Sequence, residues 1–137
     1  MSVKTYDPRE VRVTIAGLIV TGYADGTSVV IERSEPNQYN EHVGAQGEVS
    51  RTATTNKTAL LKITLKQTSP FNQTMQTIAA TLNAAKFPTQ VSNKSDLKYL
   101  GGGTETWIKI MPNKELGGEE QMREWGVFIA DFTEKEG

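Results

Sequence analysis

In residues 60–66, apolar and polar side chains alternate from Leu61 onward, and this stretch constrains the fold more than any other. One side is formed by Leu61, Ile63 and Leu65, and the other by Leu60, Lys62, Thr64 and Lys66. A period of two is typical of a β-strand with one buried face and one wet face. Residues 48–54 alternate less strongly, and a polar turn at 55–58 separates the two stretches. The sequence therefore predicts a β-hairpin over 48–66.

The turn length determines which side chains of this hairpin face each other. A turn of about three residues separates apolar from polar side chains best, whereas a two-residue turn at Asn56-Lys57 mixes both faces. The preferred register pairs Val49 with Leu65, Arg51 with Ile63 and Ala53 with Leu61. It leaves Arg51 on the apolar face, where its charge needs a partner or access to water. An ordinary half-buried hairpin is the simpler interpretation of the same pattern.

An amphipathic helix is predicted over 69–86, directly after the hairpin. Ser69 is a suitable N-cap and Pro70 suits the first helical position. Pro88 requires the helix to end by Phe87. One apolar stripe recurs at helical spacing and contains Phe71, Met75, Ile78, Leu82 and Ala85. We interpret this stripe as core rather than as a ligand-binding surface.

The remaining sequence indicates a β-rich chain. Its 137 residues suit one domain spanning 1–137. Residues 1–10 form an N-terminal arm, 34–47 a long polar loop, and 133–137 a solvated tail. Strand patterns cover 11–20, 27–32, 104–111 and 123–132, and the last has apolar residues on both faces, as in a central or interface strand. Gly101–Gly103 are expected to form a mobile turn.

The sequence contains few residues suited to catalysis or metal binding. It has no cysteine, one histidine (His42) and a net charge of −1. No thiolate metal site is possible, and His42 beside Glu41 offers too few ligands for a metal. Phosphate-binding and serine-hydrolase motifs are absent. We therefore expect no enzyme activity, cofactor or metal, and no insertion into a membrane, because no apolar run is long enough to span one.

The order of elements resembles that of bacteriophage tail tube proteins, which form the inner tube of contractile and long flexible tails. The resemblance runs from about Val11 to Phe132 and depends on GLIVTGYADGTSVVIERSE and VGAQGEVSRTATTNKTALLKITLKQTSPFNQTM. It is distributed over structural residues rather than concentrated in a short motif. The tube protein of type VI secretion is a more distant relative. Residues 1–10 and 112–121 lie outside the resemblance.

This resemblance implies a fold, an assembly and a set of partners. The fold is mainly β, a β-sandwich or half-barrel with one flanking helix and an extended hairpin. The assembly is a homohexameric ring that stacks into a hollow tube conducting the phage genome. The partners are the tail sheath protein, the tape measure protein, and the baseplate and terminator proteins. The implied location is the virion tail, assembled in the cytoplasm of the host bacterium.

The resemblance also gives the hairpin a function. A lumen must be wet and must not bind DNA tightly through clustered cations, so only weak, non-specific DNA contact in transit is expected. The lumen-facing candidates are Glu48, Ser50, Thr52, Thr54, Lys62, Thr64 and Lys66. The candidates for packing between subunits are Val49, Arg51, Ala53, Leu61, Ile63 and Leu65. Tyr39, His42 and Val43 of the long loop are candidates for contacts between rings. Because the hairpin tip at 51–60 can bury little, we expect it to become ordered only on assembly.

Three alternatives remain open on the sequence. A tail terminator or a baseplate adaptor could share this fold, and self-polymerisation separates the tube protein from both. A monomeric β-sandwich binding module is the third, with Trp107, Trp125 or Tyr39 as a stacking platform for a ligand such as a carbohydrate.

Overall fold

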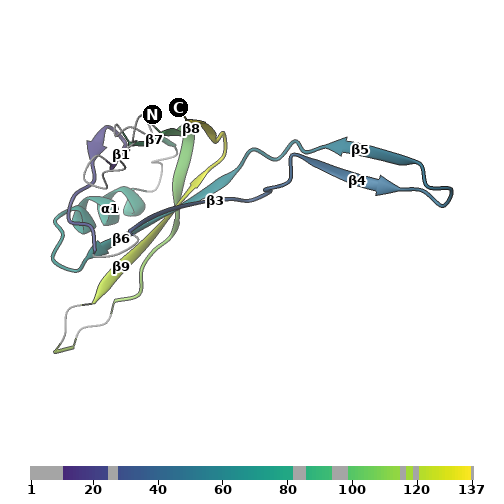
Figure 1. Cartoon of the computed structure of the whole chain (residues 1–137). Helices are drawn as coiled ribbons and strands as arrows, with labels where there is room; N and C mark the ends of the chain where they lie inside the picture. The colour runs from purple at the N-terminus through teal and green to yellow at the C-terminus, as the bar shows by residue number, and fades with distance from the viewer. Residues whose placement is uncertain are drawn as a thin grey trace, which may run out of the picture.

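A computed structural model describes residues 11–24, 28–81, 86–93, 99–114, 117–118 and 121–136. These residues form a β-rich body from which one long hairpin projects (Figure 1). The fold is mainly β, with antiparallel pairing throughout and one helix, as the sequence predicts. Five predicted segments fall at least partly outside the described residues, namely the arm 1–10, the strand 27–32 at Thr27, the helix 69–86 at 82–85, the region 112–121 at 115–116 and 119–120, and the tail at Gly137.

The described body contains one sheet and one helix. The sheet has the order β2-β1-β7-β8-β9-β6-β3, with β10 paired to β8. In chain order these strands are β1 (Val11–Ile15), β2 (Leu18–Ile19), β3 (Val29–Arg33), β6 (Ala59–Lys66), β7 (Phe87–Asn93), β8 (Tyr99–Ile110), β9 (Met122–Ile129) and β10 (Thr133–Glu136). The helix α1 is Phe71–Ala80. The projecting hairpin is a separate sheet of β4 (Tyr39–Val43) and β5 (Val49–Ala53).

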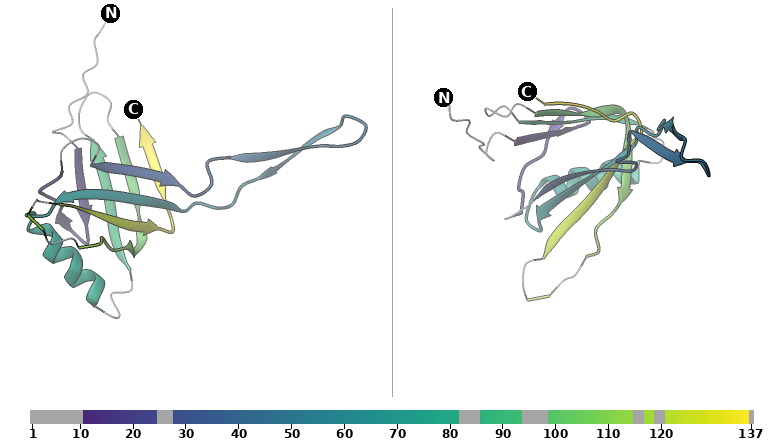
Figure 2. Two further views of the ribbon diagram at one scale, coloured as in Figure 1. Left: turned by 90° about the horizontal axis from the view of Figure 1, so that it is seen from below. Right: turned by 45° about the vertical axis from the view of Figure 1, so that its right-hand side comes forward.

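Strand β8 is long enough to take part in both layers of the body. Its first half pairs with β7 and β10, through rungs such as Gly101 with Val91 and with Glu134. Its second half pairs with β9, from Thr106 opposite Ile129 onward. The sheet therefore bends along β8 into two facing layers, β2-β1-β7-β8-β10 and β8-β9-β6-β3, which Figure 2 shows edge-on. This is the expected β-sandwich or half-barrel.

The predicted alternation of residues 60–66 is confirmed in β6. Leu61, Ile63 and Leu65 are fully buried, whereas the side chains between them are partly exposed. They pack in the core with Trp125, Val127 and Ile129 of β9 and with Val13 and Ile15 of β1. Strand β9 lies between β8 and β6, which confirms the prediction of a central strand for 123–132.

The helix begins at Phe71, close to the predicted start. Pro70 has helical dihedrals (φ −65°, ψ −19°), and the Ser69 hydroxyl accepts a hydrogen bond from the Phe71 amide at 3.3 Å. Ser69 thus satisfies one amide of the first turn, which is the N-cap role predicted for it. Phe71 and Met75 are buried and Ile78 is partly buried against the core, as the stripe predicts.

The predicted hairpin over 48–66 is wrong. Strand β6 pairs with β3 and β9, whereas β5 pairs with β4, so Val49, Arg51 and Ala53 do not face Leu65, Ile63 and Leu61. The error arose from treating 34–47 as a loop, although it contains β4. Ala59 is fully buried and Leu60 pairs with Phe128, so the region predicted as a mobile tip is partly a sheet strand.

Two further predictions need correction. Gly101–Gly103 lie inside β8 rather than in a turn, and a Cβ at Gly102 would lie 2.1 Å from the Thr89 carbonyl oxygen. Gly102 therefore permits a close approach of β7 to β8. The tail expected to be solvated forms β10, which pairs with Tyr99–Gly102 of β8. Both misassignments concern backbone pairing, which does not depend on apolar side chains.

Candidate assembly interface

The hairpin β4–β5, which we call the arm, projects from the body in all three views (Figures 1 and 2). Every residue of its two strands is exposed to solvent. In the part of the chain that the structure describes, β4 and β5 pair only with each other. A lone two-stranded ribbon is at best marginally stable in water. The arm is therefore the segment of this chain that would gain most from covering by another molecule.

The register of the arm gives it two chemically different faces. Side chains alternate across a ribbon, and directly opposed residues share a face. One face, which we call the docking face, contains Tyr39 with Ala53, Glu41 with Arg51, and Val43 with Val49. The other face contains Asn40 with Thr52 and His42 with Ser50, and we call it the polar face. Val43 and Val49 are each 70% exposed, although they are apolar.

The Arg51 charge has the partner that the sequence required. Its guanidinium carbon lies 4.2 Å from the centre of the Tyr39 ring, and Glu41 is directly opposite on the neighbouring strand. A guanidinium over an aromatic face is attracted by the ring quadrupole. The docking face is thus apolar at its tip and at its base, with opposite charges facing each other between them.

Several hydrogen bonds hold the root of the arm to the body. The Ser34 amide donates to the Thr58 carbonyl at 3.1 Å, and the Phe132 amide donates to the Lys57 carbonyl at 2.9 Å. The Asn56 side-chain oxygen accepts from the Thr58 amide at 3.0 Å and from its hydroxyl at 2.7 Å. The root is consequently part of the folded body, whereas the strands beyond it are not.

A cluster of four side chains, which we call the root clamp, lies where β3 leads into the arm. Arg33, the last residue of β3, donates to Glu134 of β10 from Nε at 3.1 Å and from a terminal nitrogen at 2.5 Å. Its guanidinium lies 5.0 Å from the centre of the Phe132 ring. The Tyr99 hydroxyl donates to the second Glu134 oxygen at 2.8 Å. The clamp therefore links the root of the arm to the C-terminal strand.

The clamp shifts the pKa values of Glu134 and Tyr99. Hydrogen bonding from Arg33 holds the pKa of the Glu134 carboxyl below its usual range. Partial burial, together with the Glu134 charge, raises the pKa of the Tyr99 hydroxyl. Tyr99 therefore stays protonated and donates to Glu134 across the physiological pH range.

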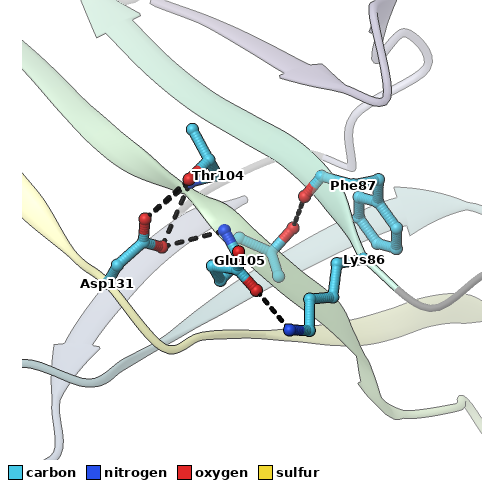
Figure 3. Close-up of polar contacts among 6 residues, drawn as sticks. Lys86, Phe87, Thr104, Glu105 and Asp131 are labelled. Carbon is cyan, nitrogen blue, oxygen red and sulfur yellow. Dashed lines mark hydrogen bonds and ion pairs between the residues drawn. The ribbon is translucent and has the colours of Figure 1, made fainter.

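The corner that precedes β10 is held by a second carboxylate (Figure 3). Asp131 accepts from the Glu105 amide at 2.9 Å and from the Thr104 amide and hydroxyl at 3.1 and 2.8 Å. The bond from the Glu105 amide is the main reason that the pKa of Asp131 is lowered. Nearby, Lys86 pairs with Glu105 at 2.7 Å on the exposed surface. The hydrogen bonds of Asp131 therefore attach the corner between β9 and β10 to β8.

Loss of the clamp should cost a measurable part of the stability. We expect Arg33→Ala to lower the free energy of unfolding by about 1–2 kcal/mol, because it removes two hydrogen bonds to one Glu134 oxygen and a contact with the Phe132 ring. Lys86→Ala is the matched control, since it removes an exposed pair with one contact, and it should change the value by less than about 0.5 kcal/mol. Urea unfolding measures both. Equal effects of the two variants would show that the clamp contributes no more to the free energy of unfolding than an exposed ion pair does.

The same clamp predicts a direction of pH dependence. The pKa of Glu134 is lower in the folded chain than in the unfolded chain, so its contribution to stability is present above about pH 4.3 and is lost as pH falls through the folded value. Glu134→Gln should therefore flatten the acid limb of the stability curve.

The outer face of the layer β8-β9-β6-β3 has an apolar end and a polar end. At one end Trp107, Phe128 and Leu60 lie side by side on adjacent strands, and the Trp107 and Phe128 ring centres are 5.1 Å apart. At the other end Glu124 faces Thr64. In the described part of the chain, no helix or strand covers this face (Figure 2). We call the apolar end, Leu60, Trp107, Ile110 and Phe128, the outer patch.

A bulge in β8 places Ile110 in the outer patch. The register shifts between Ile108 and Ile110, so that Ile110 faces Gly126. A Cβ at Gly126 would lie 2.8 Å from the Cβ of Ile110, which shows that the isoleucine covers the space left by this glycine. Lys109 lies at the edge of the patch, with its ammonium 5.4 Å from the centre of the Phe128 ring. Lys62 and Glu32, 3.3 Å apart, form another edge.

The structure distributes the predicted site residues over two regions. Of the lumen-facing candidates, Ser50 and Thr52 lie on the arm, whereas Lys62, Thr64 and Lys66 lie on β6 in the body. Of the candidates for packing between subunits, Val49, Arg51 and Ala53 lie on the docking face, whereas Leu61, Ile63 and Leu65 are fully buried in the core of this chain. Tyr39, His42 and Val43, predicted in a loop, form part of β4. The structure therefore does not bring either set together on one hairpin.

Sequence reasoning missed the outer patch, β4 and the root clamp. The sequence predicts a strand over 104–111, but the bulge that adds Ile110 to the same face as Trp107 has no sequence signal except Gly126, the residue that Ile110 faces on β9. The alternative that uses Trp125 as a stacking platform is wrong, because this side chain is 2% exposed and donates to Asn72 at 2.9 Å.

The described residues contain no group of three or more His, Asp or Glu side chains that could hold a metal ion. Among these residues, the structure also contains no helix with the length and apolar character needed to cross a membrane.

Comparison with known proteins identifies the class of fold. No family model and no curated protein sequence matches the chain. Among solved structures, the fold is shared with components of contractile injection systems, over nearly the whole length of each chain. Sequence identities are 7–10%.

Three of these structures are similar to this chain at comparable levels. One is the tube-terminating cap of the anti-feeding prophage, with a TM-score of 0.63, 9% identity, and coverage of 100% of this chain and 95% of that one. Another is from the sheath/tube terminator of the extracellular contractile injection system PVC in its extended state, with a TM-score of 0.65, 7% identity, and coverage of 98% and 99%. The third is from the PVC sheath–tube complex in the extended state, with a TM-score of 0.64, 10% identity, and coverage of 97% and 93%.

Proposed function

We propose that this chain is a structural component of a contractile tail or injection system, and that it forms a ring that terminates the inner tube. The observation that carries the proposal is the full-length likeness of the fold to two terminators of such systems. A tube protein that stacks into many rings is the second candidate, and the likeness to a chain of a sheath–tube complex favours it. Both functions need self-association and neither needs catalysis.

The exposed arm and the exposed sheet edges support self-association. β3 and β2 are the terminal strands of the sheet order, and β10 pairs with β8 alone, so described strands have backbone groups on one side without a partner strand. Natural proteins rarely leave such edges uncovered, because they pair with other chains. In a ring, neighbouring copies would cover these edges and the arm.

The outer sheet face also offers a surface for a lumen. The polar end of the outer sheet face, with Lys62, Thr64, Lys66 and Glu124, is suited to line a water-filled passage. The mixed charges there and the net charge of −1 favour weak, non-specific contact with DNA in transit. The ring is proposed to be a homohexamer that contacts sheath, tape measure and baseplate proteins. We place it in the tail of a virion or related particle, assembled in the bacterial cytoplasm.

Electron microscopy of the purified chain distinguishes the candidates. A terminator should form single rings or short stacks that stop growing as concentration rises. A tube protein should form tubes of uniform diameter and increasing length. Negative staining at a series of concentrations gives the answer, and light scattering gives the mass. A chain that stays monomeric at every salt and protein concentration contradicts both candidates and returns the binding-module alternative.

A further inference from the structure

We infer that the outer patch of one copy is the surface on which the docking face of the arm of a second copy binds. This inference deepens the proposed function and rests on it, because it specifies how two copies in the ring or stack recognise each other. It names two surfaces of one chain: Tyr39, Val43 and Val49 on the arm, and Leu60, Trp107 and Phe128 on the sheet.

The shape of the chain keeps the tip of the arm away from the outer patch of the same chain. The arm leaves the body at Arg33 and returns at Thr58, and it points away from the sheet in every view (Figures 1 and 2). Ten extended residues cover about 33 Å, so the tip lies far from the outer patch of its own chain. An arm that points outward cannot cover that patch, but the arm of another copy can.

Both surfaces expose apolar side chains to solvent. On the arm, Val43 and Val49 are each 70% exposed and Tyr39 is 41% exposed. On the sheet, Trp107 and Ile110 are each 38% exposed, beside the partly buried Phe128 and Leu60. Burying both surfaces against each other would remove apolar area from water on each side. Aromatic side chains at the centre of such a contact contribute most to its affinity.

Each of the two surfaces has charged side chains in it or at its edges. The docking face carries one acid and one base, Glu41 and Arg51, opposite each other. The edges of the outer patch carry Lys109, Lys62 and Glu32. Both signs are therefore present on both surfaces, so charges brought to the contact can be paired rather than buried alone. The polar face of the arm, with His42 and Ser50, would remain in water.

The inferred contact also has a definite symmetry. The arm and the outer patch are different surfaces, so each copy would offer one and receive the other. Such heterologous contacts repeat from copy to copy and produce closed rings or open stacks, whereas a contact between two identical surfaces stops at a dimer. The inferred contact is therefore of the kind that the proposed function requires.

Paired variants test each surface separately. Val43→Ser/Val49→Ser alters the docking face, and His42→Ser/Thr52→Ser is its control on the polar face of the same strands. Trp107→Thr/Ile110→Thr alters the outer patch, and Leu100→Thr is its control at an exposed position elsewhere on β8. Each docking-face or patch variant should weaken self-association at least about tenfold, the effect of losing one well-buried anchor. Each control should assemble like the unaltered chain.

Crosslinking locates the contact without weakening it, because the chain has no cysteine of its own. A Val49→Cys chain is assembled with a tagged Lys109→Cys chain and treated with a short bismaleimide. A crosslinked pair of one untagged and one tagged chain is expected. Leu100→Cys in place of Lys109→Cys should give none. Circular dichroism and thermal unfolding show whether each variant is folded. If the patch variant is unfolded, the crosslink alone tests whether the arm contacts the outer patch.

The outcomes separate this inference from the proposed function. If the unaltered chain forms rings but the patch variant assembles equally well and Lys109→Cys gives no crosslink, the inference is wrong and the proposed function stands. If the unaltered chain never self-associates, the proposed function fails and this inference fails with it.

Discussion

A chain whose arm is cut back to a tight turn is expected to remain folded and to lose the ability to assemble. The cut replaces Asn40–Thr52 with Asn-Gly, which joins Tyr39 to Ala53, two residues that face each other in the arm ladder. Asn-Gly suits a two-residue hairpin turn. The deleted residues are exposed and contribute nothing to the core, so the free energy of unfolding should change by less than about 0.5 kcal/mol.

The measurement pairs urea unfolding with sedimentation of the shortened chain. The expected result is an unchanged unfolding midpoint together with a monomer at concentrations where the unaltered chain forms rings. A tip variant, Ala45→Ser/Gln46→Ser, keeps both strands and serves as the control that should still assemble. Rings formed by the shortened chain at the normal concentration would mean that the sheet edges alone carry the assembly.

Replacing Trp125 with alanine is expected to have the largest effect on stability. This side chain is 2% exposed in the centre of the core, and its indole N–H donates to the Asn72 side chain of α1 at 2.9 Å. Its removal leaves a large cavity and deprives Asn72 of its donor, so the free energy of unfolding should fall by about 3–5 kcal/mol. Urea unfolding followed by circular dichroism measures the change.

The control for this variant is Trp107→Ala, which truncates a partly exposed tryptophan on the outer patch. Trp107→Ala should lower the free energy of unfolding much less than Trp125→Ala does. If the outer patch is an interface, Trp107→Ala should instead weaken self-association. A loss below about 1.5 kcal/mol for Trp125→Ala would contradict the assignment of this residue to the core. The two tryptophans thus separate stability from association in one experiment.

The sequence predicts well those parts of the fold that depend on burial. Leu61, Ile63 and Leu65 are buried as their spacing requires, and Phe71 and Met75 lie on the helical stripe that faces the core. Trp125, Val127 and Ile129 mark a central strand for the same reason. In each case the free energy of removing apolar side chains from water determines the period of the pattern.

The elements that the sequence failed to predict have no buried side to produce a pattern. Every residue of strand β4 is exposed, so neither side of Tyr39–Val43 needs to be apolar. The sequence therefore shows no strand pattern there and predicts a loop. Strand β5 was therefore paired with β6, the nearest partner with a clear pattern. β10 is likewise exposed, and only its backbone pairing with β8 and the clamp from Arg33 hold it in place.

The sequence predicts some residues of the candidate interface but not how they are arranged. The sequence predicts that Tyr39, Val43, Val49 and Arg51 make contacts between subunits or rings, and the structure shows that they share one face of the arm. Lys62 and Thr64 lie on β6 in the body, away from this face of the arm. This can be seen only when β5 is paired with β4 rather than with β6. The sequence suggests Trp107 only as a stacking platform for a ligand. It does not predict the outer patch, because the neighbours of Trp107 in that patch, Phe128 and Leu60, come from distant parts of the chain.

Hydrogen exchange of the arm amides tests most directly whether the arm serves in assembly. The same amides of residues 39–53 are followed by mass spectrometry in the free subunit and in the assembled ring. We expect fast exchange in the free subunit, because the ribbon has no core, and exchange slowed at least about a hundredfold in the ring, where a second copy covers it. Amides of β6 serve as an internal reference that should be protected in both states. Strong protection of the arm in the free subunit, or equally fast exchange in both states, would contradict its role in assembly.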